Sequence, residues 1–414
     1  MKANKTFPWI IMFAIGLISA AGLGSSMVLM GSFLTPISQA MHTSIVTVSY
    51  YYTILVLVMA IMTPMIPNIL AKVNNRLIYL IASIAITASL FLIGHFSSIW
   101  MFFIIAVIIG IAVSFLAFVP VGIIINNWFV KKTNFAIGLC WAITSVYQGI
   151  MSPVLANLIS NLGWHAALNI LATIVGILSI PFSLLIVFSP EKAGMKPYGY
   201  QVNAKATTAE QVNYSESISV KAIFASPAFW ILMIMLCFFQ FPAVLNQMFP
   251  TYAITTGFKG TVGGFMVTSA MIFDIFLNPL IGATCDKIGA EKGSILWLLL
   301  AIISYIILIF ATNTHAAGLA IFGAGINDVV YTFLGTGITA LAASILGKRA
   351  FDKGFSYVTA VSSIIGAFAM PLNNFITIQF KGFNSLFIFF MILIIINIIL
   401  VAIGDKNHFD KTVA

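Results

Sequence analysis

Charged residues are scarce in this sequence. Only 7% of its 414 residues are Asp, Glu, Lys or Arg, and 61% are hydrophobic, whereas a soluble domain is about one quarter charged and less than half apolar. Positions 7–41 and 133–189 contain no charged residue at all. Because one membrane span needs about 20 apolar residues, the first run holds one long helix and the second holds two. The first run is also far longer than the apolar core of a cleavable signal peptide.

The sequence has only three cysteines and no recognisable cofactor motif. Cys140, Cys237 and Cys285 lie in or at the ends of apolar runs, and their spacing suggests neither a disulfide framework nor a zinc site. We expect them to be small packing residues. There is no Gly-rich phosphate loop and no paired His, Cys or acidic constellation, so no cofactor, no metal and no enzyme activity are expected. A channel or a sensor stays open as an alternative, although the linker and tails leave little room for a sensor's soluble domain.

Apolar runs separated by polar breaks predict an all-α polytopic membrane protein with twelve transmembrane helices. The expected spans are 8–36, 46–71, 77–94, 99–127, 134–161, 165–188, 227–252, 262–285, 293–312, 316–346, 354–379 and 383–403. They form an N-terminal six-helix half at 1–188 and a C-terminal half with a short tail at 227–414. A polar linker at 189–226 joins the halves, and we expect a short surface helix in it near 217–225.

The basic residues are distributed unevenly across these spans. Seventeen of the nineteen Lys and Arg fall on one side, and only Lys259 and Lys381 fall on the other. Positive residues concentrate in cytoplasmic loops, so both termini and the linker are expected in the cytoplasm, with the chain multi-pass in the cytoplasmic membrane. The net charge of +9 therefore reflects orientation, and no nucleic-acid partner is expected.

Two weak internal similarities recur at nearly the same offset, about 215 residues. Segment 64–74 aligns with 279–289, and 128–132 aligns with 346–349. Each pair joins equivalent spans of the two halves. Parallel six-helix repeats are an architecture of transporters, whose binding site lies between the repeats.

The second-half segment 282–292 carries a recognisable loop motif: Gly282, Asp286, Lys287, Gly289 and Lys292. It resembles the Gly-x-x-x-Asp-basic-x-Gly-x-x-basic loop of the major facilitator superfamily. The resemblance implies the twelve-helix major facilitator fold and secondary transport of a small molecule by a monomer. It also implies that these five residues latch one conformation. The first-half copy has Pro67 and Ala71 in place of Gly and Asp, so a latch is not expected there.

Four further segments resemble one branch of that superfamily, the oxalate/formate antiporters and monocarboxylate transporters. They are Asn127–Gly138, Gly163–His165, Pro190–Gly199 and Phe273–Pro279. The branch's basic residue in span eight is replaced here by Asn278. Span eleven has no Lys or Arg, and Val361 stands about where a Lys is expected. A dianion such as oxalate is therefore not the expected substrate.

Two of the ten acidic residues fall within spans: Asp274 midway through span eight and Asp328 midway through span ten. A charged group at mid-membrane costs about 2.5–3.5 kcal/mol on insertion scales. One interpretation is that these aspartates couple transport to protons or bind a cationic part of a substrate, because alternating access changes their solvation. The other is that each is a neutral or hydrogen-bonded acid that ties helices together.

Neutral polar residues at mid-span could line a substrate cavity, since amides and hydroxyls hydrogen-bond a carboxylate without carrying charge. Hydrogen bonding between helices is the alternative for each of them. These residues are Tyr147, Gln148, Gln240, Asn246, Asn278, Asn327 and Tyr331.

The sequence thus predicts a secondary active transporter in the lipid bilayer. By resemblance its substrate is a small monocarboxylate-type anion, and two acids without a base in the spans favour coupling to protons. The alternative is a proton-driven exporter of cationic or amphipathic compounds, for which buried acids are better suited.

Overall fold

The computed structural model describes residues 6–95, 98–199 and 220–404, which form helices joined by short loops. Ten described helices are long and apolar enough to cross a membrane, and a pair bent by 43° (Lys353–Gly366 and Ala369–Gln379) makes eleven. One of the ten, α8 (Thr133–Ser183), contains two helices that meet at Gly163, whose φ of 79° is not helical. The described chain therefore has the twelve crossings that the sequence predicts. The polar stretch 201–219 of the linker lies outside the described residues.

The N-terminal half consists of six crossings. Three of them are each divided into two or three helical segments, and two share the label α8. In chain order its elements are α1 (Phe7–Ser19), the π-helix η1 (Ala20–Leu29), α2 (Gly31–Ala40), α3 (Ile45–Met62), η2 (Thr63–Met65), α4 (Ile66–Lys72), α5 (Asn75–Ile93), α6 (Ile99–Ser114), α7 (Phe118–Trp128) and α8. The expected break between spans five and six is confirmed, because the two helices that share the label α8 meet at Gly163.

The C-terminal half repeats this arrangement after the short helix α9 (Val220–Ala225), which lies within the segment where a surface helix is predicted. Its elements are α10 (Pro227–Ala243), α11 (Leu245–Thr255), α12 (Gly260–Ile288), α13 (Ala290–Thr314), α14 (Ala317–Asn327), α15 (Val329–Thr332), the π-helix η4 (Phe333–Gly337), α16 (Ile338–Gly366), α17 (Ala369–Gln379) and α18 (Phe383–Gly404). Gly347, with φ of 65°, separates the tenth crossing from the eleventh within α16.

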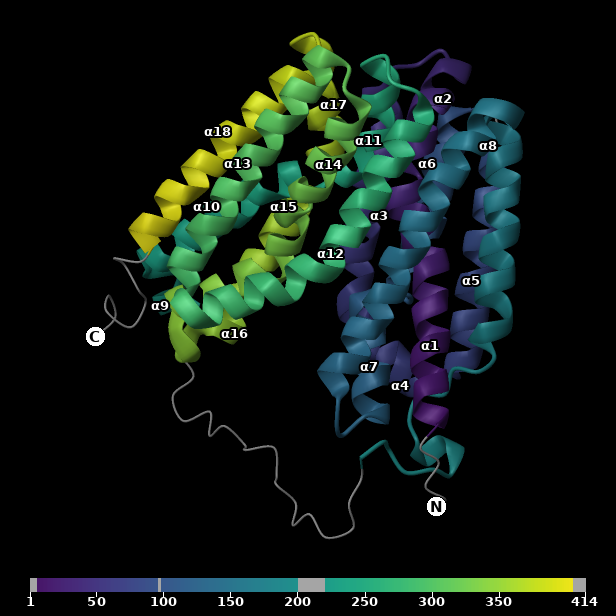
Figure 1. The fold of residues 1–414 in the computed structure, drawn as a ribbon. Helices are drawn as coiled ribbons and strands as arrows, with labels where there is room; N and C mark the ends of the chain where they lie inside the picture. Colours follow the sequence, from purple (N-terminus) through teal and green to yellow (C-terminus); the bar gives the residue numbers. More distant parts are fainter. Residues whose placement is uncertain (1–5, 96–97, 200–219, 405–414) are drawn as a thin grey trace.

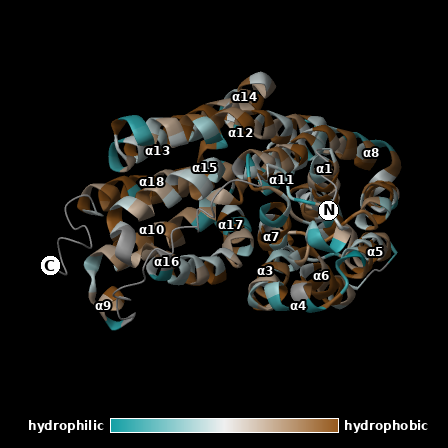
Figure 2. Cartoon of the chain, turned by 90° about the horizontal axis from the view of Figure 1, so that it is seen from below, coloured by the Kyte–Doolittle hydropathy of each residue, from teal (hydrophilic) through white to brown (hydrophobic). Residues whose placement is uncertain are grey.

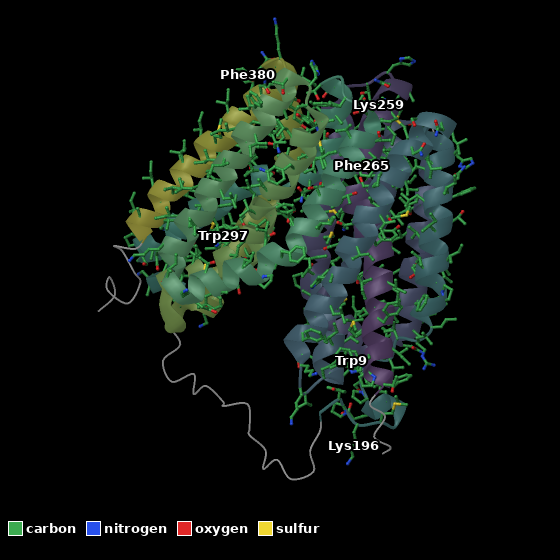
Figure 3. All side chains as sticks on the ribbon, in the orientation of Figure 1. Trp9, Lys196, Lys259, Phe265, Trp297 and Phe380 are labelled. Atoms are coloured by element: carbon green, nitrogen blue, oxygen red, sulfur yellow. The ribbon has the colours of Figure 1, made fainter. Side chains whose placement is uncertain are left out.

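The two halves lie side by side, and the helices of both run between the same two opposite faces of the bundle (Figures 1 and 2). Trp9 and Lys196 lie at one face and Lys259 and Phe380 at the other, as Figure 3 shows. We call these the linker face and the far face. Large apolar side chains cover the outside of the bundle, for example Trp100 at 73% exposure, as expected for a surface in contact with lipid. All three cysteines are free and buried, as the sequence predicts.

The chain that leaves α8 is fixed beneath the N-terminal half. The indole of Trp128 donates to the carbonyl of Val187 at 2.7 Å, and the amide of Asn127 donates to the carbonyl of Phe188 at 3.0 Å. The backbone of Tyr198 pairs with that of Trp128 and Val130. Residues 187–198 therefore move with this half, and the short 3-10 turn η3 (Glu191–Ala193) is part of this segment.

Candidate functional site

Asp274 and Asp328 come together in the C-terminal half. Asp274 lies on α12, and Asp328 lies at the break between α14 and α15. The hydroxyl of Thr332, on α15, is 3.2 Å from Oδ1 of Asp274 and 3.0 Å from Oδ2 of Asp328. One hydroxyl therefore lies between the two carboxyl groups.

The close approach of α14 to α12 depends on Gly325. A Cβ at this position would overlap the side-chain oxygen of Ser269 and lie 2.7 Å from the ring of Phe273. Small residues let membrane helices approach closely in this way. Asp328 follows one turn later, so the packing of Gly325 on α12 places its carboxyl beside that of Asp274.

Asp328 is fully buried. Asn246, on α11, donates its side-chain amide to Oδ1 of Asp328 at 2.7 Å. The regular helix is interrupted here, because α14 ends at Asn327 and the π-helix η4 begins at Phe333. Short π-helical stretches occur frequently at functional sites.

Asp274 is half-buried and accepts hydrogen bonds from two more neutral groups. Asn278, one turn further along α12, donates its amide to Oδ1 at 2.9 Å, and Ser145 donates its hydroxyl to Oδ2 at 3.2 Å. Thr336 in turn donates to Oδ1 of Asn278 at 2.7 Å. All the hydrogen-bond partners described for the two carboxyls are thus neutral. We call Asp274, Asp328, Asn246, Asn278, Thr332, Thr336 and Ser145 the acid cluster.

Ser145 is the one member of the acid cluster from the N-terminal half. It lies on the first part of α8, which packs along α12. Its bond to Asp274 links the two halves at the level of the cluster.

Some of the predicted cavity residues lie near the acid cluster or on the facing half. Tyr331 lies next to Thr332 on α15, and 42% of the residue is exposed. In the N-terminal half, the hydroxyls of Tyr147 and Ser25 are 2.8 Å apart. The side chain of Gln148 packs close to where a Cβ at Gly24 in η1 would be.

Two predicted cavity residues point elsewhere. The amide of Asn327 donates to Ser304 on α13 at 2.8 Å, and that of Gln240 donates to Ser362 on α16 at 3.4 Å. Both bonds join helices within the C-terminal half, which matches the alternative the sequence left open for them.

Three members of the acid cluster were missed from the sequence: Ser145, Thr332 and Thr336. Thr332 and Thr336 follow Asp328 at successive four-residue steps, a spacing that puts side chains on one helix face. That spacing could have identified both. Ser145 has no such signal, because its partner lies in the other half.

The halves are hydrogen-bonded to each other toward the far face. Thr35 donates to Thr251 at 3.2 Å, Asn374 to Ser49 at 2.6 Å, Thr53 to the carbonyl of Ala367 at 2.7 Å, and Thr268 to the carbonyl of Gly149 at 2.6 Å. Helices α2, α3 and α8 thereby meet α11, α17 and α12. The far end of the interface is closed.

Toward the linker face the halves diverge (Figure 1). The short elements at this end, α4 and α7 on one side and α9 on the other, pack within their own halves. The loop motif lies here too. Gly289, with φ of 93°, joins α12 to α13, and Asp286, Lys287 and Lys292 are exposed. The neighbouring Glu291 accepts a hydrogen bond from Ser344 on α16, whereas Gly282 lies beside Thr336.

Three solved structures of transporters share this fold. One is a bacterial homologue of the human lysosomal transporter Spinster, in an inward-facing and unoccupied conformation (TM-score 0.68, 16% identity, covering 98% of this chain and 97% of that chain). Another is the nucleoside transporter NupG (TM-score 0.72, 11% identity, 96% and 98%). A third is a POT family transporter in complex with a thioalcohol-conjugated peptide (TM-score 0.66, 14% identity, 97% and 97%). At these identities the likeness concerns the fold alone.

No curated protein sequence matches this chain. The family model described as "Major Facilitator Superfamily" matches residues 12–327 and 255–413, which together span nearly the whole sequence. The chain therefore belongs to the major facilitator superfamily, a family of transporters.

Proposed function

We propose that this protein is a secondary active transporter that moves a small monocarboxylate-type anion together with protons by alternating access. In this proposal it lies in the cytoplasmic membrane with both termini in the cytoplasm. The linker face is then the cytoplasmic face. The described conformation, closed at the far face, is inward-facing.

The orientation rests on the basic residues at the two faces. Among the described residues, exposed Lys and Arg at the linker face include Lys72, Arg76, Lys131 and Lys287, whereas the far face has Lys259 and Lys381. This is the distribution expected when the linker face is cytoplasmic.

The observation that carries proton coupling is the position of Thr332 between two carboxyl groups. A hydroxyl has one hydrogen, so it can donate to Asp274 or to Asp328 but not to both. Both contacts are hydrogen bonds at once only when one carboxyl carries a proton and donates it to Thr332. The geometry therefore favours a cluster that holds one proton between two acids.

The bond from Ser145 to Asp274 supports coupling of this proton to the movement of the halves. When the halves rock about the site, α8 shifts relative to α12, and Asp274 exchanges Ser145 for water or substrate. A change in the solvation of a carboxyl changes its affinity for a proton. Proton binding and conformation are then linked through one contact.

The substrate class follows from the resemblance to the monocarboxylate branch and from the groups around the cluster. Asn278 replaces a basic residue, so a substrate carboxylate would meet amides and hydroxyls and enter with a proton. Tyr331 next to the cluster and Tyr147 and Gln148 on the facing half supply such groups. The amides of Asn246 and Asn278 instead donate hydrogen bonds to Asp328 and Asp274. Asn327 and Gln240, which bond within their half, act at most as support.

The loop motif is proposed to act as a conformational latch. Gly282, Asp286, Lys287, Gly289 and Lys292 lie at the linker face, where the halves diverge in the described conformation. Asp286 and Lys287 are exposed there and free to bind the other half when this face closes.

A second candidate is a proton-driven exporter of cationic or amphipathic compounds. One observation favours it: the described hydrogen-bond partners of both carboxyls are neutral, so a cationic substrate could supply the missing positive charge. The two candidates differ in the sign of the group that the acid cluster receives.

A ligand-stabilisation screen on purified protein distinguishes these candidates, because a ligand that binds only the folded state raises its apparent stability. The screen would compare monocarboxylates, dicarboxylates, amino acids and cationic drugs at two pH values. A monocarboxylate that stabilises more at lower pH, and fails to do so in Asp274→Asn, supports proton-coupled anion transport. The matched control is Glu191→Gln, an acid in an exposed turn, which should leave the effect unchanged.

Two outcomes count against the proposal. Stabilisation by cations alone, increasing at higher pH, would favour the exporter. A monocarboxylate effect that persists in Asp274→Asn and Asp328→Asn, with the same pH dependence, would remove proton coupling from the acid cluster.

A further inference from the structure

We propose that the N-terminal half binds one anionic phospholipid between α5 and the second part of α8, with its phosphate in a basic pocket at the linker face and an acyl chain in an apolar groove above it. The site is separate from the acid cluster. It lies on the side of the N-terminal half formed by α5 and α8, away from the interface with α12.

The basic pocket has a volume of about 360 Å³ and lies where α4 turns into α5. Lys72, Arg76 and Lys192 line it together with Ile186 and Phe188, which follow α8. Lys192 is positioned by the ring of Phe188, whose centroid is 5.1 Å from its Nζ. Three cations from three different segments therefore surround one hollow.

One acid lies close to these cations. A hydrogen bond from Ser189 lowers the pKa of the Glu191 carboxyl, so this residue is ionised at neutral pH. Glu191 is exposed and does not line the pocket. The pocket thus keeps an excess of positive charge, which suits an anionic headgroup.

The N-terminus of α5 opens onto the same pocket. Asn74 caps this 19-residue helix by accepting from the N–H of Arg76 at 3.1 Å, and the first-turn N–H groups that remain attract anions. Asn75 lines the pocket with only 4% of its surface exposed, and its buried Nδ2 has no hydrogen-bond partner in the described structure. A buried amide donor without a partner is costly, and a turn of this side chain into the pocket would let it donate to a phosphate oxygen.

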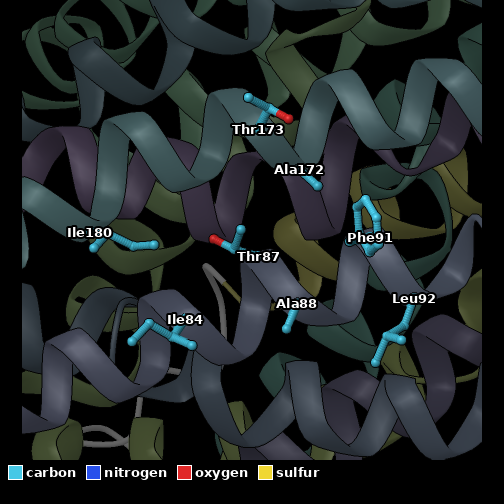
Figure 4. A pocket seen from close by; sticks show the side chains of 8 residues that line it. All are labelled: Ile84, Thr87, Ala88, Phe91, Leu92, Ala172, Thr173 and Ile180. Carbon is cyan, nitrogen blue, oxygen red and sulfur yellow. The ribbon is translucent and has the colours of Figure 1, made fainter.

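A separate apolar groove lies further along the same two helices (Figure 4). Ile84, Ala88 and Phe91 of α5 line it from one side, and Ala172 and Ile180 of α8 from the other. It also has a volume of about 360 Å³. Thr87 packs where a Cβ at Gly176 would be, so the two helices touch within the groove.

An acyl chain from the linker-face leaflet reaches the near end of the groove. With a rise of 1.5 Å per residue, Ile84 lies about 12 Å and Phe91 about 22 Å along α5 from Arg76. One leaflet contributes about half of a hydrocarbon core of about 30 Å. A chain whose phosphate sits at Arg76 therefore reaches Ile84 and Ile180 within its own leaflet, whereas Phe91 lies beyond the middle of the membrane.

Lipid binding to the purified protein, measured by native mass spectrometry and by thermal stabilisation, tests this site. The lipids are phosphatidylglycerol and phosphatidylcholine, with inorganic phosphate and glycerol phosphate as soluble anions. In Lys72→Gln/Arg76→Gln, phosphatidylglycerol should bind about 30-fold more weakly, because each basic residue near an anionic surface contributes about 1 kcal/mol. The matched control Lys131→Gln/Lys132→Gln removes two exposed charges from the same face and should change binding less than threefold.

A second variant tests the groove. Ala88→Phe places a large side chain in the groove from an exposed position. It should weaken the binding of phosphatidylglycerol with long acyl chains and leave the binding of the short-chain form unaffected. Melting temperatures in phosphatidylcholine should be unchanged in all variants, which separates lost binding from misfolding. Equal binding of phosphatidylglycerol in both double variants would overturn the proposal. So would stabilisation by inorganic phosphate as strong as by lipid, together with no effect of Ala88→Phe, because the ligand would then be a soluble anion.

Discussion

Thr332 contributes a single hydroxyl to a cluster that contains two acids. Its contacts at 3.2 and 3.0 Å to Asp274 and Asp328 link carboxyl groups of two different crossings. Such links matter more in a membrane interior than at a surface, because water is not available to replace a lost donor. Removing the Thr332 hydroxyl therefore tests whether the two acids act as a pair.

Thr332→Val keeps the shape of this side chain and removes its hydrogen bond. We expect the free energy of unfolding to fall by about 1–3 kcal/mol, because the fully buried Asp328 and the half-buried Asp274 both lose a hydrogen-bond partner. We also expect transport to fall at least tenfold. The midpoint of its pH dependence should move by about one pH unit, the equivalent of 1.36 kcal/mol. Uptake into proteoliposomes over a pH series measures both effects.

The control is Thr339→Val, two turns further along. Thr339 is exposed, and within the described residues its hydroxyl donates to the carbonyl of Gly335. Removing this hydroxyl should therefore leave the pH profile unchanged. If Thr332→Val gives the same profile and rate as Thr339→Val, the two aspartates are independent structural acids.

At the scale of helices, glycines decide how closely the halves approach at the far face. A Cβ at Gly31 on α2 would overlap the backbone carbonyl of Gln247 on α11. Because this neighbour is backbone, it cannot rotate away as a side chain could. The contact between α2 and α11 therefore tolerates no side chain at Gly31 in the far-face-closed state.

Gly31→Ala should disfavour closure of the far face by about 1–3 kcal/mol, the usual cost of overpacking. This corresponds to a shift of about 5- to 150-fold in the conformational equilibrium. Ser49→Cys and Asn374→Cys, which replace two hydrogen-bonded residues of this closure, provide the readout. The yield of a short thiol crosslinker between them should drop in Gly31→Ala.

Gly318→Ala serves as the comparison, since a Cβ at Gly318 meets no atom within 4 Å. Its crosslinking yield should equal that of the parent pair. An unchanged yield in Gly31→Ala would mean that α2 and α11 separate without opening the far face.

For the whole molecule, the decisive property is which face lies in the cytoplasm. Lys259 at the far face and Lys221 on α9 are both exposed, and the three native cysteines are buried. In intact cells a membrane-impermeant maleimide should label Lys259→Cys but not Lys221→Cys. After permeabilisation both should react to a similar extent. The reverse pattern would invert the topology and make the described conformation outward-facing.

The sequence by itself determined the spans, the expected orientation and the two mid-membrane acids. These properties are local: a run of apolar residues must form a helix in lipid because its backbone groups have no other partner. The break between spans five and six falls at Gly163 as expected. The ends of several helices differ from the expected bounds by a few residues, as at Ser183, and the interruption at Asp328 was not predicted. Asn246 and Asn278 were also identified from the sequence, because a polar residue within a span is conspicuous.

Only the tertiary structure decided which of these polar residues meet. It joined Asp274 to Asp328 through Thr332, attached Ser145 from the other half, and turned Asn327 toward Ser304. The physical reason is that helix packing in lipid depends on the fit of small residues such as Gly31 and Gly325 against particular neighbours. Hydrophobicity, which fixes the spans, does not distinguish among those neighbours.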